Sequence, residues 1–432
     1  MTPYKFAHSE VGSRLSAVGG IVELMEDLGN AMSGADRGTM RMLGGGNPAA
    51  IFEVQQAFRE RLAEIVANRD ECDRMLVNYD GPAGSPAFRE IVAEMFRTRF
   101  DWNISPENVA ITSGSQSAFF QLFALFGGHS PAGLRRILLP IVPEYIGYAD
   151  QGTAPEMFAA HLPRIELRGE HEFKYHVDSG KLDMHESLGA IAISRPTNPS
   201  GNVLSDSELE QLRKFAGERG LPLILDNAYG LPFPNAMYTP SKLPAWRDDL
   251  ILVFSLSKVG LPGARTAIVI AHEEIVRRVS AMTAVIGLAN NNIGQAIAGP
   301  MLANGELLRL SREVIQPFYA ARSQFARDAI QHEFGNRFPY RVHVSEGAFF
   351  LWLWFPELPI STRELYQRLK KRNVLVVPGD YFFYGLPANI DWPHQRQCIR
   401  VTFSQSEQVV VEGLRGIAEE LEQLHAVSAK SA

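Results

Sequence analysis

A short apolar run at residues 250–254 leads directly into Ser255-Leu256-Ser257-Lys258-Val259-Gly260-Leu261-Pro262-Gly263-Ala264-Arg265. The run has the length and composition of a buried β-strand. Packing explains Lys258 poorly, because burying an ammonium group without a partner is costly. Small hydroxyl and glycine residues surround Lys258, and the guanidinium of Arg265 follows close behind it. The segment therefore predicts a functional amine in a pocket at the end of a strand.

The chain around this segment alternates short apolar runs with amphipathic helical patterns. Such alternation is typical of a largely parallel β-sheet that is covered by helices on both faces. Between two of the runs, Ser205 and Glu208 form a capping-box pattern, and Gly220 follows the apolar stripe of that helix. The expected strands are residues 137–142, 190–194, 222–226, 250–254 and 267–271.

A length of 432 residues accommodates more than one domain. After about residue 310 the pattern changes to a long helix with a polar face, strand-like runs at 348–355 and 374–377, and a final amphipathic helix after Glu407. We therefore expect an α/β protein whose large domain has a mostly parallel sheet sandwiched by helices, with a smaller α+β domain beside it. The expected division is residues 55–310 for the large domain, and residues 1–54 with 311–432 for the small one.

Three further polar segments follow expected strands or open a helix. They are Asp226-Asn227-Ala228-Tyr229, Arg195-Pro196-Thr197-Asn198-Pro199-Ser200-Gly201-Asn202 and Ser113-Gly114-Ser115-Gln116-Ser117. Taken singly, each has a plain structural explanation as a helix cap, a turn or a helix start. Together with Lys258, however, Asn198 and Asp226 stand at the carboxyl ends of strands, where open α/β sheets bind their ligands. The combination favours a ligand site.

These residue types match the chemistry of pyridoxal 5′-phosphate. An amine held in a pocket forms a Schiff base with the aldehyde of this cofactor. An aspartate paired with the pyridine nitrogen keeps that nitrogen protonated, so that the ring can accept carbanion charge. A helix N-terminus such as that at Ser115, and a guanidinium such as that of Arg265, bind phosphate. The sequence therefore predicts a pyridoxal phosphate enzyme with Lys258 and Asp226 at its centre.

With these motifs the chain resembles the fold type I pyridoxal phosphate aminotransferases of the aspartate aminotransferase superfamily. The resemblance runs from about residue 20 to about residue 425 and extends to the branch that moves the amino group of valine to pyruvate. Four segments carry it to that branch: Leu43-Gly44-Gly45-Gly46-Asn47-Pro48-Ala49, Asn78-Tyr79-Asp80-Gly81-Pro82, Pro143-Glu144-Tyr145-Ile146-Gly147-Tyr148 and Phe350-Leu351-Trp352-Leu353-Trp354-Phe355.

The resemblance implies a role for each matching residue. The implied catalytic residues are Lys258, Asp226 and Tyr229. The implied cofactor-binding residues are Gly114, Ser115, Gln116, Tyr145, Asn198, Asp226, Tyr229, Ser255, Ser257, Lys258 and Arg265, with Tyr79 reaching the neighbouring subunit of a homodimer. The implied substrate-binding residues are Arg400, which clamps the carboxylate, Asn198, Gly45 and Gly46. Two features depart from the family pattern, namely Ala264 and the run Asn290-Asn291-Asn292.

The resemblance also implies an activity, the transfer of an amino group from valine or a similar small aliphatic amino acid to pyruvate. Segments Gly44-Gly45-Gly46-Asn47 and Gly20-Ile21-Val22 suggest a compact and largely uncharged side-chain pocket. The alternatives are a β-lyase or another aminotransferase of the same fold. A non-catalytic regulator is disfavoured, because no basic helix-turn-helix pattern precedes the domain. A nucleotide-binding Rossmann enzyme is disfavoured too, because Gly44-Gly45-Gly46 lacks the required glycine spacing.

Composition excludes several other classes of function. A net charge of -6 argues against a general hold on nucleic acid or on an anionic membrane. The two cysteines, Cys72 and Cys398, lie in no zinc-binding pattern, so we expect no metal and a reduced, cytoplasmic setting. The first residues lack the apolar run of a secretory signal, and the long uncharged stretches contain polar residues that disfavour a membrane span.

Overall fold

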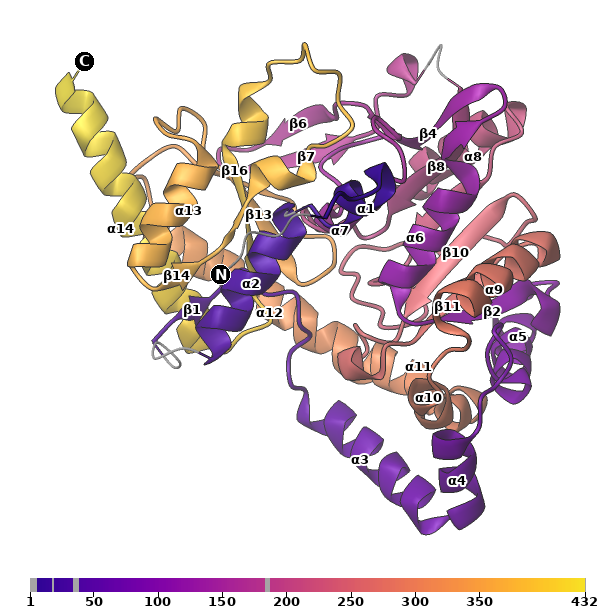
Figure 1. Cartoon of the computed structure of the whole chain (residues 1–432). Helices are drawn as coiled ribbons and strands as arrows, with labels where there is room; N and C mark the ends of the chain where they lie inside the picture. Colours follow the sequence, from indigo (N-terminus) through magenta and orange to yellow (C-terminus); the bar gives the residue numbers. More distant parts are fainter. Residues whose placement is uncertain (1–5, 18, 34–38, 183–186, 432) are drawn as a thin grey trace.

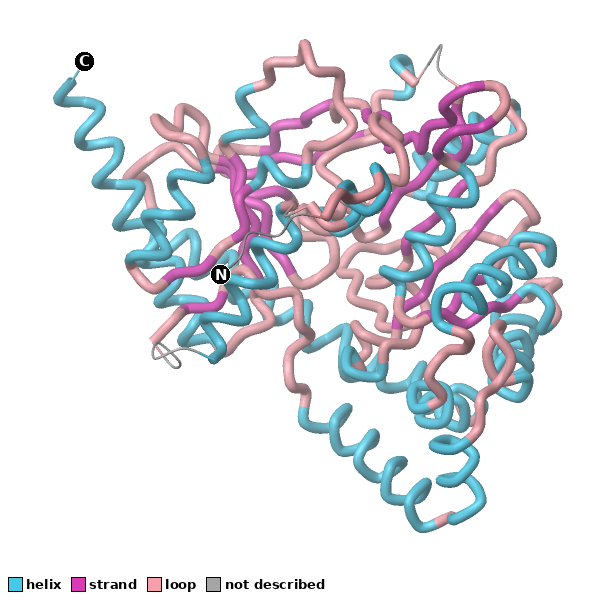
Figure 2. Tube along the Cα trace, viewed as in Figure 1, coloured by secondary structure: helices cyan, strands magenta, loops and turns pink. Residues whose placement is uncertain are grey.

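The computed structural model describes residues 6–17, 19–33, 39–182 and 187–431. Its strands form two main groups, one on each side of the molecule in the view of Figure 2. The first group is an eight-stranded sheet and the second a six-stranded sheet. A two-stranded parallel pair, β1 (Arg41–Met42) with β14 (Val374–Leu375), stands apart from both.

The eight-stranded sheet has the strand order β2-β11-β10-β9-β8-β4-β3, and β5 also pairs with β4. Its strands are β2 (Val109–Thr112), β3 (Gly128–Ser130), β4 (Gly133–Leu139), β5 (Phe158–Ala160), β8 (Leu188–Ser194), β9 (Leu223–Asp226), β10 (Leu250–Ser255) and β11 (Ala267–Ile270). Strands β4, β5, β8, β9 and β10 pair in parallel, whereas β11 runs antiparallel between β10 and β2. Strands β2, β10 and β11 are buried along their whole lengths, so this sheet forms a large part of the hydrophobic core.

The helices pack around this sheet and extend beyond it (Figure 1). They are α1 (Glu10–Leu15), α2 (Gly20–Ser33), α3 (Phe52–Ala67), α4 (Arg69–Val77), α5 (Pro86–Phe100), α6 (Ser115–Phe126), α7 (Ile146–Ala149), α8 (Asp206–Glu218), α9 (Glu273–Gly287), α10 (Ile293–Ala303), α11 (Glu306–Leu310), α12 (Gln316–Phe334), α13 (Thr362–Lys371) and α14 (Glu407–Ser431). Helix α6 lies against β2, β4, β10 and β11, and α8 contacts β9. The α/β prediction is confirmed.

Most expected elements are present, and the differences have local causes. The capping box that opens α8 forms as predicted between Ser205 and Glu208. The strand expected at 137–142 ends instead at Leu139, because Pro140 has no N–H group for the ladder. The strand expected at 222–226 begins at Leu223 for the same reason, since residue 222 is a proline.

The six-stranded sheet has the order β15-β16-β13-β12-β7-β6. Its strands are β6 (Arg164–Arg168), β7 (Glu172–His176), β12 (Arg341–His343), β13 (Phe350–Trp354), β15 (Val377–Pro378) and β16 (Cys398–Thr402). The prediction of a single strand at 374–377 is therefore wrong, because these residues are divided between β14 and β15, which belong to different sheets. The hairpin β6–β7 comes from the middle of the chain and pairs with β12. The domain boundaries at 54/55 and 310/311 stay a prediction.

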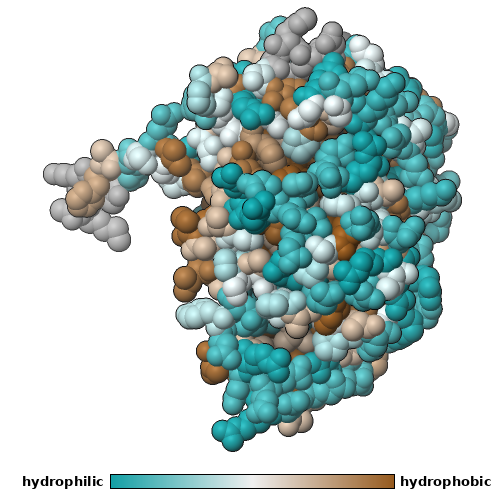
Figure 3. All heavy atoms as spheres, turned by 90° about the vertical axis from the view of Figure 1, so that its right-hand side faces the viewer, coloured by the Kyte–Doolittle hydropathy of each residue, from teal (hydrophilic) through white to brown (hydrophobic). Residues whose placement is uncertain are grey.

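The surface in Figure 3 is mostly hydrophilic, with hydrophobic side chains exposed along its left margin. Helices α3 and α4 project from the body at the bottom of Figure 1. Among the helices of the described residues, none combines the length and the apolar character that crossing a bilayer requires.

Candidate active site

A cavity of about 550 Å³ lies where β8, β9 and β10 end. It brings together almost all of the residues that the sequence singled out. Those that line it are Gly45, Gly46, Ser115, Gln116, Tyr145, Asn198, Asp226, Tyr229, Ser255, Ser257, Lys258, Arg265 and Arg400. Gly114 and Tyr79 do not line it, although Gly114 is the N-cap of α6, whose first residues do. Residues from at least five separate parts of the chain therefore meet in one space.

Lys258 lies just beyond β10 and points its amine into the cavity. Its Nζ donates a hydrogen bond to the carbonyl oxygen of Gly46 at 2.8 Å and lies 5.4 Å from the ring centroid of Tyr229. Burial, followed by repulsion from Arg400, lowers the pKa of Lys258 to about 8. The amine consequently loses its proton more readily than an ordinary lysine does, as a nucleophile or a base requires.

Asp226 ends β9 in the register position opposite Ser194 of β8. Its Oδ1 accepts a hydrogen bond from the backbone N–H of Ala228 at 2.9 Å, and its Oδ2 accepts one from the phenol of Tyr148. Burial raises the pKa of Asp226, while these hydrogen bonds and the charge of Lys258 oppose that rise. The carboxylate is thus held in one orientation at the floor of the cavity.

Arg400 projects from β16 of the other sheet. Its Nη1 donates to Oδ1 of Asn198 at 2.8 Å and its Nη2 to the carbonyl oxygen of Gly44 at 2.7 Å, with the guanidinium 4.2 Å from the ring centroid of Phe350. Burial lowers the pKa of Arg400 to about 10, so it remains charged at neutral pH. Within the described chain no carboxylate pairs with Arg400, and its buried Nε lacks a partner. A buried, unpaired guanidinium is suited to an anionic ligand.

The opposite end of the cavity combines a helix N-terminus with a second guanidinium. Gly114 caps α6 with φ +88°, and a Cβ built on it would lie 2.2 Å from Nη2 of Arg265. Only glycine therefore lets the guanidinium approach the first turn of the helix. Ser255 and Ser257 line the same region, where the backbone N–H of Ser257 donates to Oγ of Ser255 at 3.2 Å. N–H groups, hydroxyls and a guanidinium form a donor set that fits a phosphate group.

Two buried groups beside the cavity were not predicted from the sequence. The ring of Tyr148 packs against Phe119 and Phe123 and is perpendicular to that of Tyr145. Glu144 is fully buried, and its carboxylate accepts hydrogen bonds from the N–H of Tyr145 at 2.7 Å, the N–H of Ser194 at 2.9 Å and the hydroxyl of Ser194. Glu144 thereby ties the loop that carries Tyr145 to the end of β8. The available signal was a glutamate between Pro143 and Tyr145 in an otherwise apolar and aromatic motif.

The run Asn290-Asn291-Asn292, for which the sequence offered no explanation, donates hydrogen bonds to three separate segments near the site. Nδ2 of Asn290 donates to the carbonyl oxygen of Ile111 at 2.7 Å, and Nδ2 of Asn291 donates to that of Ala264 at 2.6 Å. Nδ2 of Asn292 donates to the carbonyl oxygen of Asn78 at 3.0 Å, next to Tyr79. Three side-chain amides thus hold β2, the turn before Arg265 and the end of α4 close to one another.

Comparison with known proteins identifies relatives over nearly the whole chain. Residues 57–417 match the family model for aminotransferases of class I and II. The valine–pyruvate aminotransferase of Escherichia coli (strain K12) is 44% identical over 418 residues, which cover 96% of this chain and 98% of the relative. The crystal structure of valine-pyruvate aminotransferase from Salmonella typhimurium LT2 superposes with a TM-score of 0.86 at 43% identity, covering 94% of this chain and all of that one. A putative amino-acid aminotransferase from Psychrobacter arcticum 273-4 gives a TM-score of 0.93 at 41% identity, covering 98% of this chain and 100% of that one.

Glu144 leads to a prediction on stability. Burial raises the pKa of Glu144 to about 7 from an ordinary value of 4.5. Between these two pH values the folded protein keeps a proton that the unfolded chain releases, so the contribution of Glu144 to stability falls as pH rises from 4.5 to 7. Glutamine does not titrate. The melting temperature of Glu144→Gln minus that of the parent should therefore be higher at pH 8 than at pH 5, as measured by calorimetry.

Glu210→Gln is the matched control, because Glu210 is an exposed residue of α8. For this variant we expect the same difference in melting temperature at both pH values. A Glu144→Gln variant whose difference is equally independent of pH would contradict the assigned burial effect.

Proposed function

The chain belongs to the class I and II aminotransferases, and we propose that it transfers the amino group of valine, or of a similar small aliphatic amino acid, to pyruvate. The products are 2-ketoisovalerate and alanine. The observation that carries the proposal is the convergence of Lys258, Asp226 and Arg400 on one cavity, in a chain 44% identical to a valine–pyruvate aminotransferase.

The proposed cofactor is pyridoxal 5′-phosphate, and the cavity fits it at each end. Lys258 offers an amine to the aldehyde, Asp226 a carboxylate to the pyridine nitrogen, and the N-terminus of α6 with Arg265 a seat for the phosphate. The glycine at position 114 leaves the space that the guanidinium of Arg265 occupies. Tyr145, Asn198 and Tyr229 line the same cavity. In the proposed complex Tyr145 would contact the face of the cofactor ring, and Asn198 and Tyr229 would contact its hydroxyl group.

When bound, this cofactor supplies an aldehyde that captures the amino group and a ring that accepts the electron pair of the α-carbon. The protein's part is to hold and move protons. The amine of Lys258, with a pKa of about 8, would take the proton from the α-carbon of the amino acid and, as an ammonium, would later donate it. Asp226 keeps a proton on the ring nitrogen. Arg400 and Asn198 bind the substrate carboxylate, which orients the α-hydrogen towards Lys258.

The same residues serve both halves of the reaction. The first substrate would leave as a 2-keto acid whose new carbonyl oxygen comes from water, while the amino group would stay on the bound cofactor. Pyruvate would then enter the same cavity, take up the amino group in the reverse sequence of proton movements and release the water. Because the two substrates occupy one site in turn, the kinetics are ping-pong.

The walls of the cavity favour small aliphatic side chains. Apolar residues from α2, β1 and α7 line it, namely Ile21, Leu24, Met25, Met42 and Ile146. The cations that line it are Lys258, Arg265 and Arg400, and each has a role above. No further cation among the lining residues remains for a side-chain carboxylate, which disfavours aspartate and glutamate. One methylene in such a pocket changes transition-state binding by only about 1–3 kcal/mol, so neighbouring aliphatic donors also react.

We also propose that the enzyme is a homodimer with shared active sites. Tyr79 is 82% exposed and lies outside the cavity of its own chain. Exposed apolar side chains occur just before Tyr79 in the sequence and near Asn292, whose side chain is hydrogen-bonded to the carbonyl oxygen of Asn78. They are Leu76, Val77, Leu288 and Ile293. An apolar surface of this kind marks an interface, and the projecting helices α3 and α4 in Figure 1 are available to a second copy. We also propose a cytoplasmic setting, in which Cys72 and Cys398 remain free thiols.

A panel of amino donors assayed with pyruvate tests the proposed activity. Valine should react with a catalytic efficiency well above that of aspartate or glutamate, because the cavity lacks a second carboxylate partner. Formation of alanine and the 2-keto acid is measured by chromatography. An inert valine with a reactive glutamate would contradict the substrate assignment, and release of ammonia without a keto acid acceptor would indicate a lyase.

Reduction with borohydride tests the proposed cofactor attachment. After reduction of the purified holoenzyme, peptide mass analysis should place a pyridoxyl group on Lys258, because burial keeps its amine partly unprotonated. The matched control is Lys258→Ala, in which this label should be absent. A label on a different lysine would refute the role of Lys258.

Mixed dimers test the shared site. Lys258→Ala protein and Tyr79→Phe protein each have only defective sites. After subunit exchange, one site of the mixed dimer combines an intact Lys258 with an intact Tyr79, so activity should exceed the sum of the two parents. Activity equal to that sum, in samples shown by mass spectrometry to have exchanged, would place Tyr79 outside the shared site.

A further inference from the structure

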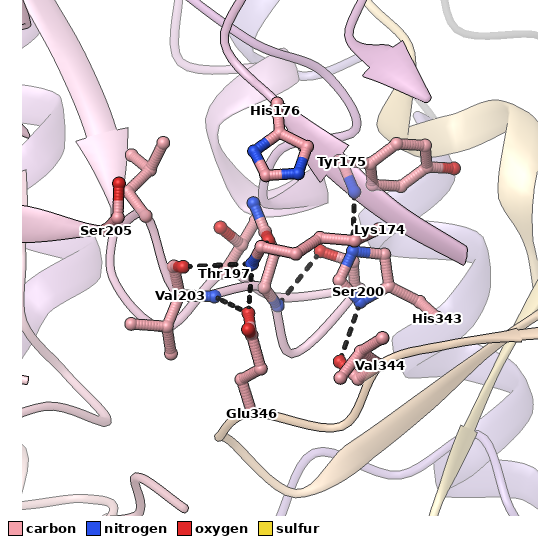
Figure 4. A network of polar contacts seen from close by, with 12 residues as sticks. Lys174, Tyr175, His176, Thr197, Ser200, Val203, Ser205, His343, Val344 and Glu346 are labelled. Atoms are coloured by element: carbon pink, nitrogen blue, oxygen red, sulfur yellow. Dashed lines mark hydrogen bonds and ion pairs between the residues drawn. The ribbon is translucent and has the colours of Figure 1, made fainter. Parts of the chain in front are cut away.

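Away from the cavity, a buried ion pair within the six-stranded sheet contacts the segment that follows β8 of the other sheet. The ammonium of Lys174, on β7, contacts Oδ1 of Asn202 at 2.9 Å, the carbonyl oxygen of Val203 at 3.2 Å and the carboxylate of Glu346 (Figure 4). Oε2 of Glu346 accepts a further hydrogen bond, from the N–H of Val203 at 2.9 Å. Only 5% of Lys174 is exposed, and all three of its N–H donors are used.

Stability alone is a weak explanation for this pair. Two charges lose their hydration when they are buried, and well-packed apolar residues in the same places are often equally or more stabilising. What an apolar pair cannot do is hold particular backbone and side-chain atoms at particular positions. The atoms held here, in Asn202 and Val203, belong to the segment that follows β8 and contains Asn198.

This segment is tightly closed, so a displacement of one end reaches the other. The N–H of Thr197 donates to the carbonyl oxygen of Asn202 at 2.9 Å, and the N–H of Gly201 donates to that of Thr197 at 2.8 Å. Gly201 has φ +69°, and a Cβ built on it would lie 2.7 Å from the carbonyl oxygen of Gly347, next to Glu346. A Cβ on Gly347 would in turn lie 2.4 Å from Cγ of Pro196. The loop at residues 196–203 and the loop that contains Glu346 and Gly347 are therefore in direct van der Waals contact.

We propose that Lys174 and Glu346 are positioning residues for the carboxylate end of the cavity. They hold the 196–203 segment against the second sheet, and this places the amide oxygen of Asn198 where Nη1 of Arg400 donates to it at 2.8 Å. The inference rests on the proposed function only in that Asn198 and Arg400 bind a substrate carboxylate. Loss of the pair should weaken carboxylate binding and leave proton transfer at Lys258 intact.

The decisive variant is the double replacement Lys174→Met with Glu346→Gln, studied as the holoenzyme. It removes both charges, so neither is left buried alone, and it keeps an amide oxygen for the N–H of Val203. The probe is isovalerate, which has the carboxylate and branched side chain of valine and no amine. Isovalerate should bind about tenfold more weakly by titration calorimetry, the KM for valine should rise with little change in kcat, and a crystal structure should show the Asn198–Arg400 bond broken or displaced.

Three further variants make the result unambiguous. Glu346→Gln alone keeps an oxygen for Lys174 and Val203 but removes the counter-charge of Lys174, so isovalerate should bind it more weakly than the parent and more tightly than the double variant. Asn202→Ala leaves the ion pair in place and removes one atom that it holds, so affinity should fall even if the double variant fails to fold. Glu420→Gln disrupts a buried partner of Arg372, far from the cavity, and should change the melting temperature alone.

Parental isovalerate affinity together with an intact Asn198–Arg400 bond, in the double variant or in Asn202→Ala, would overturn the proposal. A parent enzyme that binds no isovalerate would instead count against the proposed substrate. In that case the Asn198–Arg400 distance in the crystal structures still decides whether Lys174 and Glu346 act as positioning residues.

Discussion

Two cations at the cavity, Lys258 and Arg400, impose the constraint on which the rest of the site depends. An ammonium or guanidinium group removed from water must regain its hydrogen bonds. Both regain one from the same short segment, Lys258 from the carbonyl oxygen of Gly46 and Arg400 from that of Gly44. Because a carbonyl group carries no net charge, each of these side chains gains a hydrogen-bond acceptor and no counter-ion, so it remains available to an anionic or electrophilic ligand.

The segment that supplies these carbonyl groups, residues 43–47, is itself held by hydrogen bonds at both of its ends. Leu43 is fully buried, and its carbonyl oxygen accepts the N–H of Thr402 on β16 at 2.8 Å. The hydroxyl of Ser404 donates to the carbonyl oxygen of Asn47 at 2.9 Å. The segment is thus anchored beside the six-stranded sheet on both sides of Gly44, and its Gly46 carbonyl oxygen accepts the amine of Lys258, just beyond β10 of the eight-stranded sheet. A part of the chain far from β10 in sequence thereby becomes a wall of the cavity.

Sequence alone predicted the parts of this arrangement that local patterns encode. Asn198, Asp226 and Lys258 follow apolar strand-like runs, and the edge of a parallel sheet brings such residues together. Their gathering with Arg400 in one cavity is a finding of the structure, and their individual roles stay predictions. Tyr148 was missed because an aromatic side chain in an apolar setting looks like core. The pairing of β7 with β12, which adds the β6–β7 hairpin to the second sheet, was missed because no local pattern encodes contacts between distant segments.

The same long-range pairings govern where the two ends of a substrate lie. Lys258 belongs to the eight-stranded sheet and Arg400 to the six-stranded one, so the span between the proposed base and the proposed carboxylate clamp is a distance between sheets. The Asn198–Arg400 hydrogen bond crosses that boundary inside the cavity, and the Lys174–Glu346 contact holds the Asn198 segment to the second sheet from outside it. Because a carboxylate and an α-hydrogen are separated by a fixed covalent geometry, any shift of one sheet against the other misplaces one of them. Contacts remote from the chemistry can therefore control the reaction by holding the sheets in register.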